Sequence, residues 1–248
     1  MSTTETSRRQ ERTALQRGLG LLLYLVGLGI GVALMGGIVW ANLEARLFDP
    51  ETVGERLTTL RCPLLVTPQE VATAQVTVEN PLDRPIRRRL RFRVAQGSVL
   101  LVEEEQALVP LEPGERRTFS WDVDPAQGVY GGRFLMVSAA LSGYPPLPAR
   151  HGACGTLVVP LPALRGVHIL LLGNLLALGG MLLGLGLRGE GWRRQQRLDA
   201  FDSGLRILVG LYVLGMGALL LGHWWALAGM TLFLMGLILL GLIFRQSS

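Results

Sequence analysis

Four long apolar runs divide this chain, and one polar stretch of about 125 residues lies between the first run and the second. The runs cover residues 18–41, 166–187, 205–222 and 224–244. Each is close to the ~20 apolar residues with which an α-helix crosses ~30 Å of hydrocarbon. Within lipid, a spanning segment has to satisfy its own backbone hydrogen bonds, which favours helices. The pattern therefore predicts four transmembrane helices and a water-soluble domain at residues 42–164.

The soluble segment alternates apolar and polar residues with period two, which indicates strands rather than helices. Its clearest stretch has apolar residues on one face and arginines on the other: Ile86, Leu90, Phe92 and Val94 against Arg87, Arg89, Arg91 and Arg93. Turn signals at Asn80-Pro81 and Gln96-Gly97 separate such stretches. About seven strands with turns between them are typical of a β-sandwich. We therefore predict an α+β membrane protein in which a seven-stranded β-sandwich is inserted between the first and second transmembrane helices.

Two short motifs in this segment resemble the bacterial Ig-like modules of the cell-adhesion-related, CARDB-like type. In Val76–Pro81 a strand ends in an asparagine turn, and in Val109–Glu115 a Pro-Gly-Glu corner precedes an aromatic strand. The resemblance covers about 100 residues and none of the four apolar runs. It implies an Ig-like sandwich fold and no particular function, because such sandwiches have many unrelated roles.

Charge is distributed unevenly along the chain. All 24 basic residues are arginine. The soluble domain is nearly neutral, with 13 arginines against 14 acidic residues between positions 41 and 164, so binding to nucleic acid is not expected. The excess arginines flank the apolar runs, at Arg8, Arg9, Arg12, Arg17, Arg188, Arg193, Arg194, Arg197, Arg206 and Arg245.

Short arginine-rich flanks stay in the cytoplasm according to the positive-inside rule. We therefore predict a multi-pass protein of the bacterial cytoplasmic membrane with an extracytoplasmic soluble domain. Its cytoplasmic parts are a tail at residues 1–17, a loop at residues 188–204 and a C-terminus at residues 245–248. A cleaved signal peptide is the alternative, because Val39-Trp40-Ala41 is similar to a cleavage site. The first run has about two dozen residues, more than the 7–15 of a signal h-region, which favours an uncleaved helix.

The chain has two cysteines, Cys62 and Cys154, which lie near the two ends of the soluble domain. In an oxidising compartment such a pair is expected to form a disulfide. Two unpaired buried thiols are the alternative. No metal site is expected, because two cysteines with His151 as the single nearby histidine do not complete a tetrahedral set of ligands.

One strand of the soluble domain presents a candidate interaction surface, the arginine stripe, which consists of Arg87, Arg89, Arg91 and Arg93. The stripe could bind anionic lipid headgroups or an acidic partner. The other interpretation is neutralisation by acidic residues on the next strand. A hairpin turning at Gln96–Gly97 would place Arg89 opposite Glu104. It would also place Arg88 near Glu105, which favours the second interpretation.

Glycines recur in all four apolar runs, and two pairs have GxxxG spacing: Gly27 with Gly31, and Gly180 with Gly184. Small residues let helix backbones approach closely in lipid, so these glycines are predicted to pack on other helices. Four glycine-bearing helices in so small a bundle would leave faces for a partner. The alternative is a glycine-rich composition without a packing role. The runs contain no Asp or Glu, so a proton relay is not expected.

Two histidines, His168 and His223, are predicted near the outer surface of the membrane. A bis-histidine haem or a quinol site would use such residues. Interfacial histidines beside an aromatic belt such as Trp224 and Trp225 are commoner, so no cofactor is expected. Asn174, in the second run, is predicted to form a hydrogen bond between helices.

No motif in the sequence indicates catalysis. The chain has no GxSxG elbow, HExxH motif, P-loop or dinucleotide-binding fingerprint, and its three histidines are dispersed. We therefore expect a non-catalytic accessory or scaffold subunit of a larger bacterial membrane complex, with other integral membrane subunits and membrane lipid as partners. One alternative is a free-standing envelope protein that binds an extracytoplasmic ligand or polymer through its sandwich. A transporter component is a second alternative.

Overall fold

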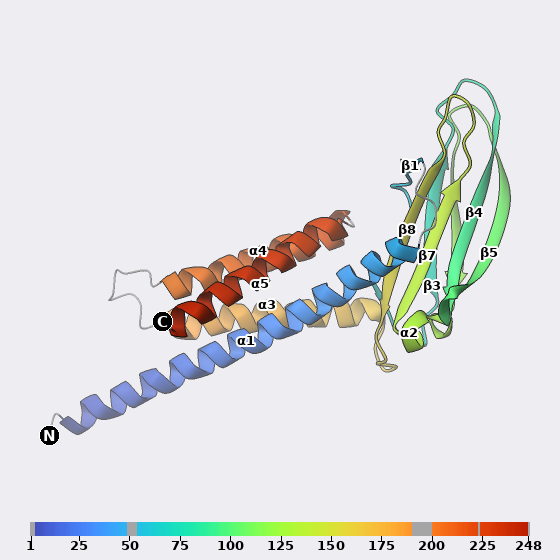
Figure 1. Ribbon diagram of the computed structural model, residues 1–248. Helices are drawn as coiled ribbons and strands as arrows, with labels where there is room; N and C mark the ends of the chain where they lie inside the picture. Colours follow the sequence, from blue (N-terminus) through green and yellow to red (C-terminus); the bar gives the residue numbers. More distant parts are fainter. Residues whose placement is uncertain (1–2, 49–53, 190–199, 223, 248) are drawn as a thin grey trace. The chain divides into compact units, whose positions relative to one another are not determined.

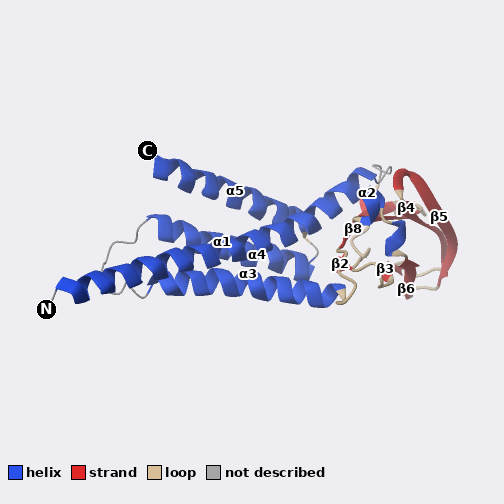
Figure 2. Ribbon diagram, turned by 90° about the horizontal axis from the view of Figure 1, so that it is seen from below, coloured by secondary structure: helices blue, strands red, loops and turns tan. Residues whose placement is uncertain are grey.

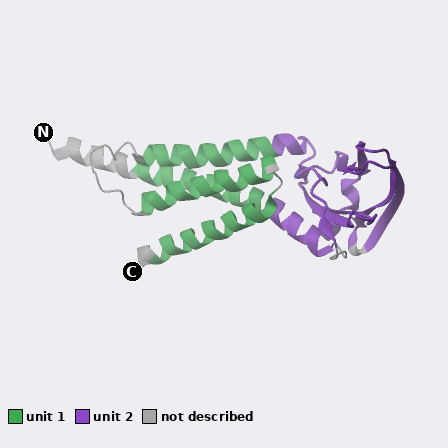
Figure 3. Ribbon diagram, turned by 90° about the horizontal axis from the view of Figure 1, so that it is seen from above, with its two compact units in different colours: residues 1–36, 170–248 green, residues 37–169 purple. Residues whose placement is uncertain are grey.

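The computed structural model describes residues 3–48, 54–189, 200–222 and 224–247 (Figure 1). The chain divides into two compact units. The helical unit comprises residues 1–36 and 170–248, and the β domain comprises residues 37–169 (Figure 3).

Four long helices confirm the four helical runs that the sequence predicts. They are α1 (Thr3–Phe48), α3 (Gly166–Gly189), α4 (Ala200–Gly222) and α5 (Trp225–Ser247). Each contains a stretch long and apolar enough to cross a membrane, and the mean hydropathy of that stretch lies between 2.0 and 2.5. The α1 helix has 46 residues and continues beyond the expected span of residues 18–41 at both ends. The added residues are mostly Ala, Leu, Glu, Arg and Gln, which favour helix.

The described residues of the β domain form eight strands in two sheets (Figure 2). The larger sheet has the strand order β1-β8-β7-β4-β5. Its sixth strand, β2, also pairs with β8. The smaller sheet consists of the antiparallel strands β3 and β6. A 3-10 helix at Pro125–Gln127 and the short helix α2 at Val129–Gly132 connect β6 to β7. The strands are β1 (Glu55–Arg56), β2 (Leu65–Val66), β3 (Ala72–Glu79), β4 (Ile86–Gln96), β5 (Ser98–Leu111), β6 (Arg116–Val123), β7 (Phe134–Leu141) and β8 (Arg150–Val158).

The expected number of seven strands differs from the structure because of β1. Its two residues, Glu55 and Arg56, are both exposed, so no alternation marks the strand in the sequence. The strand forms by parallel pairing with β8, where Glu55 lies beside Arg150 and Arg56 beside His151. A strand defined by such a tertiary pairing leaves no local pattern.

The core of the β domain lies between the two sheets. Burial alternates along β4 as predicted, with the apolar residues inside and Arg87 and Arg89 exposed. The ring of Phe92 on the larger sheet stacks on Trp121 of the smaller sheet, with 4.3 Å between the ring centroids. The period-two pattern in the sequence therefore identifies the inner faces of the strands correctly.

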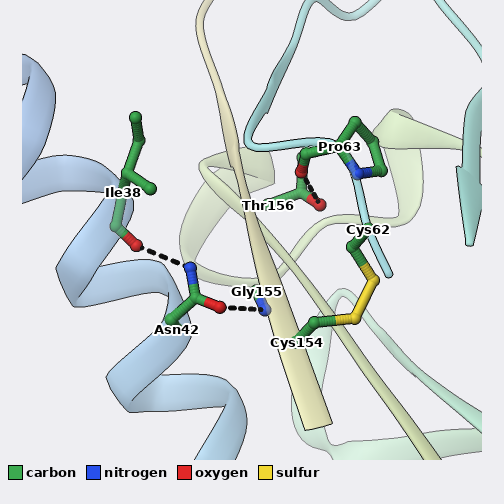
Figure 4. The surroundings of a disulfide bond; sticks show 7 residues. All are labelled: Ile38, Asn42, Cys62, Pro63, Cys154, Gly155 and Thr156. Atoms are coloured by element: carbon green, nitrogen blue, oxygen red, sulfur yellow. Dashed lines mark hydrogen bonds between the residues drawn. A yellow bond between two sulfur atoms is a disulfide. The ribbon is translucent and has the colours of Figure 1, made fainter. Parts of the chain in front are cut away.

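A disulfide joins Cys62, which precedes β2, to Cys154 in β8 (Figure 4). The two Cα atoms are 6.1 Å apart, and both residues belong to the core between the sheets. The bond spans 92 residues of sequence. It therefore connects the beginning of the domain to its last strand, which is consistent with the expected pairing.

The last turns of α1 pack on the larger sheet within the β domain. Gly155 in β8 lies directly against the α1 backbone, and a Cβ at this position would overlap the carbonyl oxygen of Ala41. The Oδ1 atom of Asn42 accepts a hydrogen bond from Gly155 N at 3.4 Å (Figure 4). One turn further on, Ala45 joins a small core with Ala95, Val129 and Met136. The absence of a side chain at residue 155 is what allows the helix to reach the sheet.

Glu70, in the loop after β2, caps the N-terminus of α3. Its Oε2 atom accepts hydrogen bonds from Gly166 N at 2.7 Å, from Thr67 N at 2.9 Å and from Thr67 Oγ1 at 3.0 Å. Burial acts to raise the pKa of this carboxyl, but the hydrogen bonds and the nearby Arg165 outweigh it, so the pKa lies below its ordinary value. The Thr-x-x-Glu spacing of Thr67 and Glu70 accounts for the local hydrogen bond from Thr67 N, whereas no spacing in the sequence indicates the contact with Gly166, which is 96 residues away.

We expect Glu70→Ala to destabilise the β domain by about 1 kcal/mol at neutral pH, because it removes the cap of α3. A lowered folded-state pKa means that Glu70 stabilises the fold above the unfolded-state pKa of a glutamate, and that this contribution is lost as the pH falls through the folded-state pKa. Thermal unfolding of the full chain in detergent, at neutral and at acid pH, measures this. The control is Glu105→Ala, at an exposed position. A deficit that stays the same in acid would contradict the prediction.

Candidate ligand-binding cavity

A cavity of about 400 Å³ in the β domain is lined by residues of both sheets. One wall comes from β3 and β6, and the other comes from β4, β7 and β8. The segment that connects β1 to β2 completes the lining. The lining residues are Leu57, Thr58, Thr59, Arg61, Thr77, Val78, Glu79, Arg88, Arg116, Leu141 and Arg150.

Arg88 is a buried cation in the wall of this cavity, with 2% of its surface exposed. Its Nε donates a hydrogen bond to Ser142 O at 2.8 Å, and its Nη2 donates to Pro148 O at 2.6 Å. The pKa of the guanidinium is lowered, first by burial and then by the positive charge of Arg150. An arginine starts from so high a pKa that Arg88 is nevertheless charged at neutral pH. Because its partners are neutral carbonyl groups, its positive charge is not cancelled.

The other three arginines of the cavity differ in their partners. Arg116 forms an ion pair with Glu79, with 2.7 Å between Nη2 and Oε2. Arg150 pairs more loosely with Glu55, with 3.2 Å between Nε and Oε2. In the part of the chain that the structure describes, Arg61 has no carboxylate at ion-pair distance. The lining holds four arginines and one glutamate, which is an excess of positive charge. Arg61, Arg116 and Arg150 are exposed to solvent, and Arg88 is the buried member of the four.

The arginine stripe lies on the opposite, outer face of β4. Arg93 forms an ion pair with Glu104 on β5, with 2.6 Å between Nε and Oε2, and this hydrogen bond lowers the pKa of Glu104. Arg89 lies opposite Leu108, which is not acidic. The remaining two arginines, Arg87 and Arg91, lie opposite Pro110 and Gln106. Direct cross-strand ion pairing is therefore present at the Arg93 end of the stripe.

The predicted pairing between these two strands is wrong by four residues. Glu104 lies opposite Arg93 rather than Arg89, and Arg88 lies opposite Val109 rather than near Glu105. An irregularity at the hairpin accounts for three of these residues, because Gln96 pairs with Ser98 but Ala95 already pairs with Val102. The fourth arises because the turn is centred on Gly97 rather than between Gln96 and Gly97. The turn residues locate the hairpin, but they do not reveal extra residues on one strand, and such residues shift every later pair.

The glycines for which the sequence predicts helix packing lie against other helices of this chain: Gly27, Gly31, Gly180 and Gly184. A Cβ on Gly27 would lie 2.7 Å from a carbonyl oxygen of α3, and a Cβ on Gly180 would lie 3.0 Å from Gly27 Cα. A Cβ on Gly184 would lie 2.5 Å from Gly20 O. A Cβ on Gly31 would lie 2.7 Å from the ring of Tyr212 in α4. Within the helical unit, α1 therefore packs on α3 and α4 through these four positions.

Two tyrosines form polar contacts between helices that the sequence analysis did not identify. The hydroxyl of Tyr24 donates to Leu205 O at 2.7 Å, and the hydroxyl of Tyr212 donates to Asn174 Oδ1 at 2.7 Å. Asn174 thus forms the hydrogen bond between helices that the sequence predicts. Tyrosines inside apolar runs are a usable signal, because a buried hydroxyl needs a hydrogen-bond partner.

Several residues named in the sequence analysis lie outside the described residues. They are His223 and, in the predicted cytoplasmic loop, Arg193, Arg194 and Arg197. The side chains of Arg8, Arg9, Arg12 and Arg245 are also outside the description. His168 lies in the first turn of α3. Over the described ranges, no group of three or more His, Cys, Asp or Glu residues is placed to hold a metal ion.

No protein-family model matches this sequence, and no curated protein matches it either. Among solved structures, the chain is similar to the CARDB domain of a Pyrococcus furiosus protein in complex with di-metal ions, with a TM-score of 0.33 and 14% identity over 44% of this chain and 93% of that one. It is also similar to β-glucuronidase 2 of Bacteroides uniformis, with a TM-score of 0.29 and 17% identity over 40% of this chain and 12% of the enzyme. For a Listeria innocua β-glucosidase the TM-score is 0.27, with 13% identity over 41% of this chain and 16% of the enzyme. A CARDB domain is thus among the solved structures to which this chain is similar.

Proposed function

We propose that this chain is a non-catalytic accessory subunit of a larger bacterial membrane complex, and that it contacts a partner subunit through the free edge of β5. This strand is the last of the larger sheet, and among the described residues it pairs with β4 alone. It has 14 residues, more than most strands in globular proteins. This long unpaired edge is the observation that supports the proposal.

An unpaired strand edge presents backbone N–H and C=O groups to any extended segment of another chain. Leu101 and Leu108 on β5 are 64% and 63% exposed, which adds apolar contact area to the edge. Three consecutive glutamates, residues 103–105, disfavour pairing between two copies of the same edge because like charges would face each other. The edge therefore favours a different chain, one with basic or apolar residues at the contact.

The helical unit supports a contact through the β domain rather than through the glycine motifs. The four GxxxG glycines lie against helices of this chain, so their faces are occupied. We place the β domain outside the cytoplasm as an Ig-like sandwich, because arginine-rich flanks favour cytoplasmic termini and a cytoplasmic loop between α3 and α4. In this topology the β5 edge is available to the extracytoplasmic part of another integral membrane subunit.

Gentle solubilisation of the native membrane tests this function. The wild-type chain should co-migrate with other membrane proteins in an assembly much larger than its own 27.0 kDa. The double variant Leu101→Asp/Leu108→Asp should leave that assembly, because a partner strand would have to bury two carboxylates. The control Val71→Asp changes an equally exposed apolar residue outside β5 and should remain assembled. A wild-type chain that migrates alone, or a double variant that stays assembled, would refute the proposal.

A further inference from the structure

We propose that the basic cavity lined by both sheets binds a phosphate group. No β5 residue lines the cavity, so this site is separate from the β5 edge. Two lining arginines, Arg61 and Arg88, have no carboxylate at ion-pair distance among the described residues, and of these Arg61 is exposed to solvent while Arg88 is buried. An uncompensated buried cation is unfavourable, and an anionic ligand would provide the missing negative charge.

The number of available donors favours phosphate over a carboxylate. A carboxylate has two oxygens, and one bidentate guanidinium already engages both. A phosphate dianion has more acceptor oxygens and about twice the charge, so two guanidinium groups can bind it together. Arg116 and Arg150 lie in the same walls, each with a single carboxylate partner, and they increase the positive potential at the site.

The fixed position of the Arg88 guanidinium and the size of the cavity also favour binding of a small ligand. The two carbonyl groups that bind Arg88 hold its guanidinium in place before any ligand arrives, which limits the entropy lost on binding. Thr58 adds a hydroxyl to the lining, while Leu57, Val78 and Leu141 provide apolar surface for the carbon part of a phosphate ester. A volume of about 400 Å³ lies within the range of small-molecule sites.

Titration calorimetry with inorganic phosphate, on the full chain in detergent, tests the site. Wild type should bind phosphate saturably at one site per chain, and Arg61→Gln should weaken binding roughly tenfold or more. The matched control is Arg87→Gln, on the outer face of the strand that carries Arg88, and it should bind like wild type. Acetate should bind at least about tenfold more weakly than phosphate, since it lacks the additional oxygens and charge. Absence of saturable binding, equal effects of the two substitutions, or acetate binding as tight as phosphate would overturn the proposal.

Arg88→Met tests the buried arginine itself. The carbonyl contacts of Arg88 also support the segment between β7 and β8. The phosphate affinity of this variant is therefore compared with that of wild type only if its thermal midpoint is unchanged. If the variant is destabilised, the phosphate affinity of Arg61→Gln decides the test. A folded Arg88→Met chain with undiminished phosphate binding would overturn the assignment.

The source of the phosphate is distinguished in nanodiscs of phosphatidylcholine with and without phosphatidic acid. A lower apparent affinity for inorganic phosphate in the presence of phosphatidic acid indicates a lipid headgroup, and an unchanged affinity together with binding of glycerol phosphate indicates a free ester.

Discussion

Replacing Cys62 and Cys154 with serine is expected to lower the free energy of unfolding of the β domain by roughly 4–5 kcal/mol, the value of the chain-entropy model for a loop of this length. The bond spans 92 residues, so removing it returns a large conformational freedom to the unfolded chain. Both residues also belong to the core between the sheets, where a serine hydroxyl would have to find a hydrogen-bond partner. The loss is a large part of the stability of a small domain.

Native-state hydrogen exchange of the full chain measures this effect at the amides of β7 and β8, interior strands of the larger sheet whose amides are expected to exchange through opening of the whole domain. Wild-type protein treated with a reductant serves as the control and should show the same increase in exchange as the double serine variant. Equal protection in the oxidised, reduced and serine forms would show that the disulfide does not stabilise the domain.

Replacing Gly27 and Gly31 with leucine is expected to disrupt the helical unit itself. Side chains at these positions would overlap the α3 backbone and the ring of Tyr212, so α1 would have to move away from both helices. By analogy with hydrogen bonds between membrane helices, losing each such contact should cost on the order of 1–2 kcal/mol. A lower thermal midpoint in detergent, with earlier aggregation on size-exclusion chromatography, is the expected result.

Gly29→Leu is the matched control for this pair, because a Cβ on Gly29 would meet no atom within 4 Å. It introduces the same side chain on the same helix, and leucine favours helix more than glycine does, so its thermal midpoint should be unchanged or slightly higher. If instead the Gly27/Gly31 variant were as stable as wild type and lost only its co-purifying partners, the glycine faces would serve another protein and the packing of α1 on α3 and α4 would be wrong.

The arginines of the candidate cavity could not be grouped from the sequence. Arg88 lies two residues before Leu90 and four before Phe92, so the alternation of side chains along β4 already places it on the inner face of the sheet. Its neighbours in a run of arginines obscured that signal. The remaining arginines of the cavity come from other segments: Arg61 before β2, Arg116 at the start of β6 and Arg150 at the start of β8. No spacing in the sequence connects these positions, because the pairing of the strands brings them together.

The sequence by itself determined the features that depend on neighbouring residues. Run length identified four helices that can cross a membrane, and period-two alternation identified the buried faces of the strands, because a helix and a strand each impose a fixed geometry on consecutive side chains. The tertiary structure decided the features that depend on residues far apart in the chain. The irregularity beside Gly97 set which β5 residues face the arginine stripe, and a glycine at residue 155 let α1 reach the sheet. Packing also decided that the GxxxG glycines meet helices of this chain, since a small residue permits a close approach but does not specify which helix makes it.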